Sequence, residues 1–512
     1  MNIWNDAEQA LLDQLLTEEE KQQMKQAAED RILQKQEPMR PAYHFSAPNG
    51  SLNDPNGLCF WKGNWHMFYQ SNHGSGWRWG HAVSTDLLRW RDLPIAITPQ
   101  VEKECWSGMV LVEEERAIAV WYGLGSGIFI AVSHDPLLVR WEKLNGGEPV
   151  IPKADPTKDR YVAFDPCIWK NGDRYCLVSG KFELNPHTGT RVRTPFLFTS
   201  ADLLHWEFQD ASLLENDLYA GIDDDAACPY FVKCGDRRLF IHFSHHSGPK
   251  IAVGSYDESR DRFTVTGGMD LTSSSSFFGG LHAPAVFTDA DGAVKAIFNV
   301  NHCKNPGVDY QIMSLPWRIS LDGHRGNDIF LEPAEQLTSL RVPESHTEEH
   351  GRFLPANEPY YPKACFGDTV ELIAELEAKN VPMVEFKLLM SEDEEEFTAV
   401  RIFRVRGNTY LPAFGPGVSY RVGHETVVQL DATRSSRVGN VRIPDTQSFY
   451  LQPDEPIKAR IFLDRTVVEV FVNGRVALTA RVSPAAGNRG ISITSRGDGL
   501  TLSKLESYEL RL

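Results

Sequence analysis

The sequence predicts an all-β protein in which a five-bladed β-propeller is followed by a β-sandwich, with a short helical arm at the N-terminus. The first observation is a repeated hairpin between about residues 40 and 335. Successive hairpins begin near Asp54, Ser107, Asp165, Cys228 and His282, so their starts lie 53 to 63 residues apart. Self-similarity at this period, with about four strands in each unit, is typical of propeller blades. Five such units indicate five blades.

A second repeat interleaves with the hairpins. Residues 84–90 (STDLLRW) are echoed by residues 200–206 (SADLLHW), and a looser copy occupies residues 133–141. An aspartate followed by two leucines and a tryptophan is typical of a tight turn that carries a packing ring. We interpret these segments as structural turns of the outer strands.

The third observation is a change in the pattern of predicted strands near residue 366. Short strands are predicted at residues 384–389, 398–405, 459–464, 467–472 and 490–495, without the earlier repeat. This pattern predicts a β-sandwich over residues 366–512, joined to the propeller (residues 38–335) by a linker over residues 336–365. The sandwich is expected to brace the propeller. It also offers a surface for a homodimer, which the sequence leaves open.

Residues 1–37 are predicted to form the helical arm. Leu11, Leu12, Leu15 and Leu16 form an apolar stripe, and Thr17 with three following glutamates indicates a second helix start. We expect the arm to pack on a neighbouring domain or on a second subunit.

The composition limits the classes of partner. The chain has 512 residues and a formal net charge of −17, which argues against nucleic-acid backbones and anionic membranes. The sequence shows no apolar run of 18 residues and no secretory leader, so a cytoplasmic location is expected. The eight cysteines are scattered without a CxxC pair, which predicts buried free thiols. No cofactor and no metal are expected.

Acidic residues stand at the starts of three hairpins. They are Asp54 within residues 53–57 (NDPNG), Asp165, and the run 223–225 just before Cys228. The innermost strand of a blade starts at the central channel, so these carboxyl groups are expected to converge there. Like charges repel, and clustered carboxylates therefore indicate acid–base chemistry or metal binding. Glycoside cleavage and calcium binding are the two uses that the residues alone leave open.

The motifs, in their order, resemble glycoside hydrolase family 32, the β-fructofuranosidases. The matching segments are residues 53–57 (NDPNG), 66–70 (HMFYQ), 79–87 (WGHAVSTDL), 105–108 (CWSG), 164–166 (FDP), 228–229 (CP) and 463–471 (LDRTVVEVF). The resemblance runs from about His44 to the C-terminus. It implies a five-bladed propeller with a C-terminal sandwich, and a retaining hydrolase that forms a fructosyl-enzyme.

By position, the resemblance assigns roles to residues of this chain. Asp54 matches the family nucleophile. Asp165 matches the acid that binds hydroxyls of the fructosyl ring and stabilises the transition state. The residues that match the fructose subsite are Asn53, Gln70, Trp106 and Ser107, with Trp77 as a further aromatic wall.

Two positions depart from the family pattern. Phe164 stands where the family usually has arginine, and Ala227 stands where the family has its acid/base glutamate. An alanine cannot transfer a proton, so another group acts there or catalysis is lost. Asp225 is the first candidate, because two residues along an extended strand return to the same side. Asp224 is the second candidate, and both Phe164 and Asp224 are expected to line the substrate site.

The histidines receive weaker assignments. His81 and His282 are interpreted as structural, whereas His245 and His246 are minor candidates for the site. A zinc site at the last two is not expected, because partners at ligand spacing are lacking.

The leading interpretation is a retaining hydrolase of β-fructofuranosides, meaning sucrose-type oligosaccharides or fructans. The missing arginine and the displaced acid favour a substrate other than plain sucrose. Two alternatives stay open: a fructosyltransferase that forms oligosaccharides or cyclic difructose anhydrides, and a fructan-binding protein with weakened catalysis. The motif at residues 53–57 argues against the related propeller hydrolases of arabinose and xylose polymers.

Overall fold

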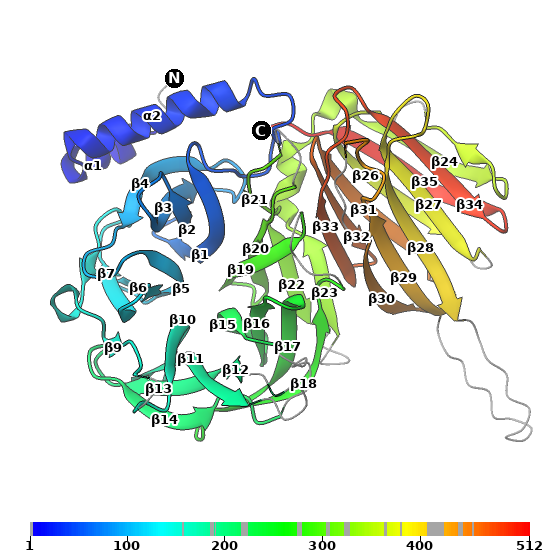
Figure 1. Cartoon of the computed structure of the whole chain (residues 1–512). Coiled ribbons are helices and arrows are strands. Elements are labelled where there is room, and N and C mark those ends of the chain that lie inside the picture. The colour runs from blue at the N-terminus through cyan, green and yellow to red at the C-terminus, as the bar shows by residue number, and fades with distance from the viewer. Residues whose placement is uncertain are drawn as a thin grey trace, which may run out of the picture.

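The computed structural model describes residues 4–155, 158–184, 189, 191–216, 224–273, 279–303, 308–321, 328–362, 366–378, 381–406, 424–438, 444–452 and 455–512. Asp223 and Cys365 lie outside these residues. Nearly all regular structure in the described residues is β-strand, as predicted. Figure 1 shows a ring of sheets beside a two-layered sandwich, with a helical arm along the ring.

The sheets of the ring follow one another in chain order. The first contains β1 (Ser51–Trp61), β2 (Asn64–Asn72), β3 (Trp77–Ser84) and β4 (Arg91–Ile97). The next contains β5 (Cys105–Val112), β6 (Ala117–Gly123), β7 (Gly127–Ser133), β8 (Glu142–Lys143) and β9 (Ile151–Pro152). It is followed by β10 (Val162–Asn171), β11 (Arg174–Leu184), β12 (Arg191–Thr194), β13 (Phe196–Ser200) and β14 (Glu207–Ser212).

The ring continues with two further sheets. One contains β15 (Ala227–Cys234), β16 (Arg237–Ser244), β17 (Gly248–Asp257) and β18 (Arg262–Asp270). The other contains β19 (Leu281–Thr288), β20 (Val294–Val300), β21 (Ile312–Met313), β22 (Trp317–Leu321) and β23 (Ile329–Pro333). Short 3₁₀ helices lie at Asn145–Gly147, Glu335–Leu340 and Pro343–Ser345.

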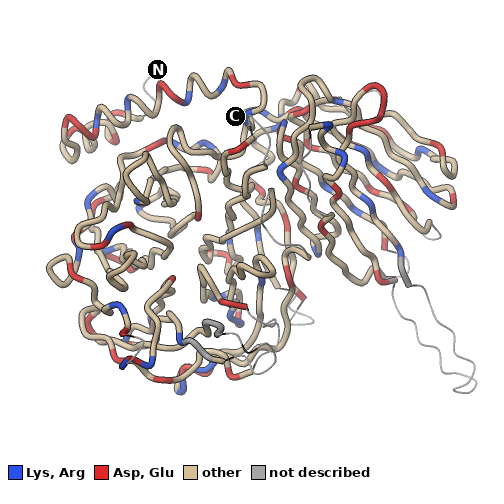
Figure 2. The backbone as a smooth tube through the Cα atoms, viewed as in Figure 1, with Lys and Arg blue, Asp and Glu red and all other residues tan. Residues whose placement is uncertain are grey.

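The innermost strands contact one another around a common centre. β1 contacts β5 and β19, β10 contacts β5 and β15, and β15 contacts β19. The sheets therefore close into the ring of a propeller (Figure 1). Asp54 lies on β1, Asp165 lies on β10, and Asp225 lies two residues before the start of β15. Figure 2 shows acidic residues on strands beside the centre of the ring and over the outer surface.

The Asp-Leu-Leu repeats form turns of the outer strands, as predicted. Asp86 accepts hydrogen bonds from the backbone N–H groups of Leu88 and Arg89 at 3.0 and 2.8 Å. Asp202 makes the equivalent two bonds in its own copy of the turn. An aspartate that satisfies the donors of its own turn accounts for the repeat without a binding role.

The arm consists of α1 (Asp6–Leu15) and α2 (Glu18–Gln34), and Thr17 caps the second helix. Leu12 and Leu16 pack in one cluster with Val83 of β3. Arg31 of α2 forms an ion pair with Asp92 of β4 at 2.8 Å. Of the two partners expected for the arm, the structure therefore shows the neighbouring domain of the same chain.

Two six-stranded sheets form the sandwich (Figure 1). One contains β24 (Thr347–Leu354), β26 (Thr369–Glu377), β31 (Ile457–Asp464), β32 (Val467–Val472), β33 (Val476–Arg481) and β35 (Leu500–Glu509). The other contains β25 (Pro359–Tyr360), β27 (Met383–Met390), β28 (Thr398–Arg406), β29 (His424–Asp431), β30 (Asp445–Leu451) and β34 (Gly490–Arg496).

The stretch 336–365, predicted as a linker, differs in the structure. It contributes β24, which pairs with β35, and β25, which pairs with β34. β24 lies at a sheet edge, and most of its residues are exposed. An exposed edge strand lacks the apolar alternation by which a strand is recognised in sequence. The sandwich therefore begins before residue 366.

A buried ionic cluster joins the sandwich to the ring; we call it the His44 cluster, meaning His44, Asp464 and Glu469. His44 Nδ1 lies 2.8 Å from Asp464 Oδ2, and His44 Nε2 lies 3.1 Å from Glu469 Oε1. The Trp317 indole donates to the other oxygen of Glu469 at 3.0 Å. Because His44 precedes β1 and Trp317 lies on β22, the cluster ties both ends of the ring to β31 and β32.

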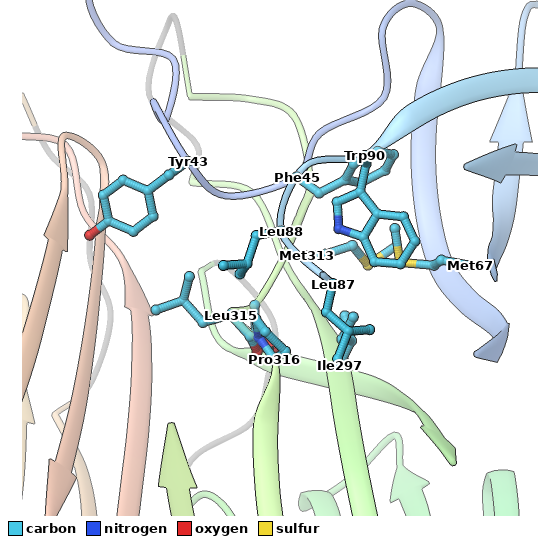
Figure 3. Close-up of a pocket in the computed structure, with 11 residues that line it drawn as sticks. Tyr43, Phe45, Met67, Leu87, Leu88, Trp90, Ile297, Met313, Leu315 and Pro316 are labelled. Carbon is cyan, nitrogen blue, oxygen red and sulfur yellow. The ribbon is translucent and has the colours of Figure 1, made fainter. Parts of the chain in front are cut away.

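An apolar pocket lies beside the His44 cluster (Figure 3). It is lined by Tyr43, Phe45, Met67, Leu87, Leu88, Trp90, Ile297, Met313, Ser314, Leu315 and Pro316. The Tyr43 ring points toward the sandwich in Figure 3, and its hydroxyl donates to the carbonyl of Leu463 at 2.7 Å. Its lining side chains are apolar or aromatic apart from Ser314, and none of the acidic residues of the channel lines it, so we interpret it as packing at the closure of the ring.

Candidate active site

Asp54 lies in an irregular part of β1. The pairing of β1 with β2 shifts register twice across the motif at residues 53–57, and such shifts re-aim the side chains of a strand. Gly57 has a φ of 58°, and a Cβ placed there would lie 2.5 Å from the side chain of Val110 on β5. The glycine of the motif therefore permits both the backbone turn and the close approach of two blades.

A hydrogen-bond network from three strands holds one oxygen of Asp54. The Ser107 hydroxyl on β5 donates to Asp54 Oδ2 at 2.6 Å. The Gln70 amide on β2 donates to Ser107 Oγ at 2.8 Å and to Asp54 Oδ2 at 3.4 Å. The Asn53 amide in turn donates to the Gln70 oxygen at 3.0 Å. Four residues that were predicted for the site, from three motifs, thus form one connected group.

The other oxygen of Asp54 faces a histidine. Asp54 Oδ1 lies 3.3 Å from Nδ1 of His282 on β19. Burial by itself raises the pKa of this carboxyl group, but the His282 imidazole, the Ser107 hydroxyl and the Cys228 thiol outweigh burial and hold the pKa below its usual value. A buried carboxylate that stays ionised is suited to act as a nucleophile.

His282 is the contact of Asp54 that the sequence interpretation missed, because a structural role was expected for it. The hairpin repeat of the sequence nevertheless indicated a position at the channel for His282. His282 stands at the start of its hairpin, as Ser107 and Asp165 do in theirs. In a closed ring, equivalent positions of different blades meet at the channel.

Asp165 meets Asp54 through a shared cysteine. Cys228 Sγ lies 3.6 Å from Asp54 Oδ2 and 3.6 Å from Asp165 Oδ2. The backbone N–H of Cys228 donates to Asp165 Oδ2 at 3.1 Å. Both carboxyl groups are buried, at 7% and 5% exposed. Two carboxyl groups that share one thiol are close enough to contact the same sugar ring.

An aromatic wall stands next to Asp165; we use this name for Trp106, Tyr122 and Phe164. The ring centroid of Phe164 lies 5.2 Å from that of Tyr122 and 6.4 Å from that of Trp106. The Trp106 indole donates to Glu104 at 2.7 Å, which fixes the orientation of the ring. At Phe164, where the family usually has a charged arginine, the aromatic wall therefore presents an apolar surface.

Trp77, predicted as a further wall, opens β3 and is half-buried. It pairs with Asn72, which itself pairs with Ser51 of β1. Trp77 is therefore two strands removed from the strand that carries Asp54.

The two carboxyl groups predicted to replace the family acid have different partners. Asp225 Oδ2 lies 2.6 Å from Nδ1 of His245. Asp224 accepts a hydrogen bond from the Ser247 hydroxyl at 2.6 Å and lies 3.3 Å from Lys250 Nζ. Asp224 is thus bound to an ammonium group, whereas Asp225 is bound to an imidazole.

The backbone between Asp225 and Ala227 corrects one part of the sequence argument. Ala226 has a φ of 43°, so the chain is not extended there. The expectation that Asp225 and Ala227 face the same side by strand alternation therefore does not hold. The placement of Asp225 follows instead from its contacts with His245.

The remaining histidines lie in other surroundings. His81 is buried and lies 3.0 Å from His66, and burial holds its pKa well below the usual value, in keeping with the structural role expected for it. His246 is exposed in the turn after β16, where its N–H donates to Ser244 Oγ at 3.2 Å.

The described residues also bear on metal binding and on membrane crossing. Within these residues, no group of three or more His, Cys, Asp or Glu side chains is arranged to hold a metal ion. Neither of the two α-helices in this part of the chain combines the length and the apolar character that a membrane crossing needs.

Comparison with known proteins decides the family. Residues 44–333 match the N-terminal domain of glycosyl hydrolases family 32, and residues 336–509 match the C-terminal domain of the same family. The chain belongs to glycoside hydrolase family 32. It is therefore a glycosidase, as the motifs predicted.

Members of family 32 are similar to this chain over most of its length. A β-fructofuranosidase (insoluble isoenzyme 6) of Oryza sativa subsp. japonica is 28% identical, over 92% of this chain and 90% of the relative. The levanase of Bacillus subtilis is 23% identical, over 93% of this chain and 71% of its own length. The solved structure of fructan 1-exohydrolase IIa from Cichorium intybus has a TM-score of 0.76 at 21% identity, covering 93% of this chain and 98% of its own. This likeness confirms the fold class of propeller followed by sandwich.

Ala227, one of the two positions expected to depart from the family pattern, lies in apolar surroundings. It belongs to a small cluster with Cys228, Phe243 and Ala283. Ala227 is fully buried in it. The side chains packed beside residue 227 are therefore apolar, and residue 227 itself carries no group that can transfer a proton.

Proposed function

We propose that this chain hydrolyses β-fructofuranosides, such as fructans and sucrose-type oligosaccharides, with retention of configuration. The observation that carries the proposal is the pair of buried carboxyl groups, Asp54 and Asp165, that contact the same cysteine thiol. The relatives support it, because they include a β-fructofuranosidase, a levanase and a fructan exohydrolase. We also propose that the five sheets of the ring are five blades, as the hairpin count predicts.

The arrangement suits a two-step displacement. Asp54 attacks the anomeric carbon of the fructosyl unit, the bond to the leaving sugar breaks, and a fructosyl ester forms on the carboxylate. Asp165 binds ring hydroxyls and stabilises the charge that develops on the ring. Water then attacks the same carbon and restores the Asp54 carboxylate. Asn53, Gln70 and Ser107 hold Asp54 in place throughout.

The aromatic wall favours a substrate other than plain sucrose. An apolar surface beside Asp165 packs against the face of a sugar ring, whereas an arginine would hydrogen-bond its hydroxyl groups. Longer fructans or fructosyl disaccharides supply a second ring for such packing. Trp77 and Asp224 are proposed at the margin of this subsite.

The test is a panel of sucrose, 1-kestose, inulin, levan and difructose anhydrides, with free fructose and oligosaccharides both quantified by chromatography. Hydrolysis is expected to release free fructose from at least one member of the panel. Transfer products without free fructose would show instead a transferase that forms oligosaccharides or cyclic difructose anhydrides.

A second candidate function has one observation in its favour. The buried Ala227 removes the acid from its family position, so a fructan-binding protein with weakened catalysis is the alternative. Calorimetry that detects oligosaccharide binding, together with no product after days at high enzyme concentration, would support this alternative and overturn the hydrolase.

Replacing His282 with glutamine tests the environment of Asp54. The substitution removes the imidazole that favours the ionised carboxylate, so the pKa of Asp54 is expected to rise. The nucleophile then becomes protonated at higher pH than in the wild type, and the acidic limb of the kcat/KM profile moves to higher pH. An acidic limb that stays in place would show that His282 does not influence Asp54.

A further inference from the structure

The proposed hydrolase needs a group that gives a proton to the leaving oxygen, and the structure offers one beside the empty family position. Ala227 pairs with Phe243 across β15 and β16. Asp225 lies two residues before Ala227 and His245 lies two residues after Phe243, so both stand just outside the ends of β15 and β16. These two residues contact each other, and we call them the Asp225–His245 pair.

The geometry of the pair is that of an oriented imidazole. Asp225 Oδ2 lies 2.6 Å from His245 Nδ1, and Asp225 Oδ1 accepts the backbone N–H of His245 at 3.2 Å. The Asp225 carboxylate thus contacts both the imidazole ring and the backbone N–H of His245. A carboxylate at Nδ1 fixes the tautomer of a histidine and leaves proton transfer to Nε2. The His245 side chain is 49% exposed, at the solvent side of the site.

Ring contacts connect this pair to the nucleophile. The centroid of Phe243 lies 5.2 Å from that of His245 and 3.9 Å from that of His282. The centroids of His245 and His282 lie 6.4 Å apart. His282 in turn contacts Asp54 Oδ1 at 3.3 Å. His245 is therefore linked to Asp54 through the ring of His282.

This spacing separates the roles of the two histidines. In retaining glycosidases the acid and the nucleophile lie about 5–5.5 Å apart, because the anomeric carbon and the leaving oxygen fit between them. His282 touches the nucleophile itself, which leaves no room for a sugar between the two groups. His245 is half exposed to solvent and 6.4 Å from His282 between ring centroids, and we infer that the leaving sugar departs on this side.

We propose that His245 is the catalytic acid/base of this chain and that Asp225 is its positioning residue; the proposal rests on the fructosidase function proposed above. In the first step Asp54 forms its bond to the anomeric carbon, the bond to the leaving oxygen breaks, and the protonated His245 Nε2 gives its proton to that oxygen. In the second step neutral His245 takes a proton from water, whose oxygen attacks the anomeric carbon and releases Asp54. The net reaction consumes one water and regenerates both groups.

Other titratable groups lie near the Asp225–His245 pair on neighbouring elements. Asp224 and Lys250 form an ion pair at 3.3 Å, with both side chains nearly buried. His242 lies on β16 and His282 on β19. Asp224 is held by Lys250 and Ser247, so it is a less suitable proton donor than His245. The Asp225 carboxylate stabilises the charged form of His245 most directly, because it is in contact with the ring.

The first test compares His245→Gln with wild type on two substrates. On sucrose and 1-kestose the leaving alkoxide needs a proton, and kcat/KM is expected to fall about 10²–10⁴-fold. On β-fructofuranosyl fluoride the leaving fluoride needs no proton, so formation of the fructosyl-enzyme is expected to change little. Sodium azide, which needs no base, should then accelerate turnover and yield β-fructofuranosyl azide.

The matched control is His205→Gln. His205 Nδ1 lies 2.7 Å from Asp202 Oδ2, so it forms a similar histidine–aspartate pair, but in an exposed outer turn. Its rates and its response to azide are expected to equal those of the wild type. Equal losses on natural substrates and on the fluoride in His245→Gln, without azide rescue, would overturn the proposal.

The second test uses Asp225→Asn, read through the pH profile. Loss of the carboxylate removes the group that stabilises the charged imidazole, so the alkaline limb of kcat/KM is expected to move to lower pH. If Asp225→Asn abolished turnover while His245→Gln kept the full rate on sucrose and 1-kestose, Asp225 would carry the proton and the proposal would fail. If the wild type cleaved no fructoside, the proposed function would fail first, and this inference with it.

Discussion

Replacing Asp54 with alanine is expected to lower kcat/KM on every fructoside that the wild type cleaves, on the order of 10⁴-fold or more. The reason is that the proposed covalent bond forms on this carboxylate. Ser107 and Gln70 hold Oδ2 of Asp54, and His282 faces Oδ1, so three partners fix the position of the side chain.

The measurement is initial rate on the fructoside panel, with circular dichroism to show that the variant is folded. Azide added to Asp54→Ala is expected to enter from the face that Asp54 occupied and to yield α-fructofuranosyl azide. This is the opposite anomer from the one expected for His245→Gln, so the two variants separate the nucleophile from the acid/base by product alone.

The control for this prediction is Asp236→Ala, in the exposed turn between β15 and β16. It removes a carboxylate from the same blade as Asp225 without touching the channel, and its rate is expected to match the wild type. An Asp54→Ala variant that kept the full rate on every active fructoside would refute Asp54 as the nucleophile.

Replacing His44 with alanine is expected to lower the free energy of unfolding by about 3–5 kcal/mol. The His44 cluster is fully buried, and removing the imidazole leaves the carboxyl groups of Asp464 and Glu469 without the ring between them. Such a loss is larger than that of an exposed ion pair, because the buried partners cannot turn to water. Thermal unfolding of wild type and variant measures it.

The effect is expected to depend on pH. Burial lowers the pKa of His44, but the hydrogen bonds to Asp464 and Glu469 outweigh burial and raise it to about 9 from the usual 6.5. A group whose pKa is raised on folding stabilises the folded state fully below its unfolded pKa and loses that contribution as pH rises through the folded pKa. The difference in melting temperature between wild type and variant should therefore be largest near pH 6 and shrink toward pH 9.

The control is His350→Ala. His350 lies 2.9 Å from Glu348, but its side chain is 62% exposed, and exposed pairs contribute only about 0–1 kcal/mol. Its melting temperature is expected to stay close to that of the wild type across the same pH range. A His44→Ala variant that behaved like this control would show that the cluster does not hold the sandwich to the ring.

The sequence was sufficient for the fold class and for one half of the site. The hairpin repeat is local information, because each turn and each alternating strand is encoded within about sixty residues. The residues around Asp54 were assigned by resemblance, because Asn53, Gln70 and Ser107 each lie in a short motif that matches family 32. The edge strand β24 was missed, because its residues are mostly exposed and carry no apolar alternation.

The other half of the site was decided by tertiary structure alone. The contact of His282 with Asp54, the bridge of Cys228 between two carboxyl groups, and the pairing of Asp225 with His245 all join segments that are distant in the chain or separated by a turn. No local pattern encodes such contacts, because they exist only once the ring has closed and the inner strands share one channel. Residue propensity and hydrophobic periodicity determine local secondary structure, whereas the channel is formed by contacts between strands that are far apart in the sequence.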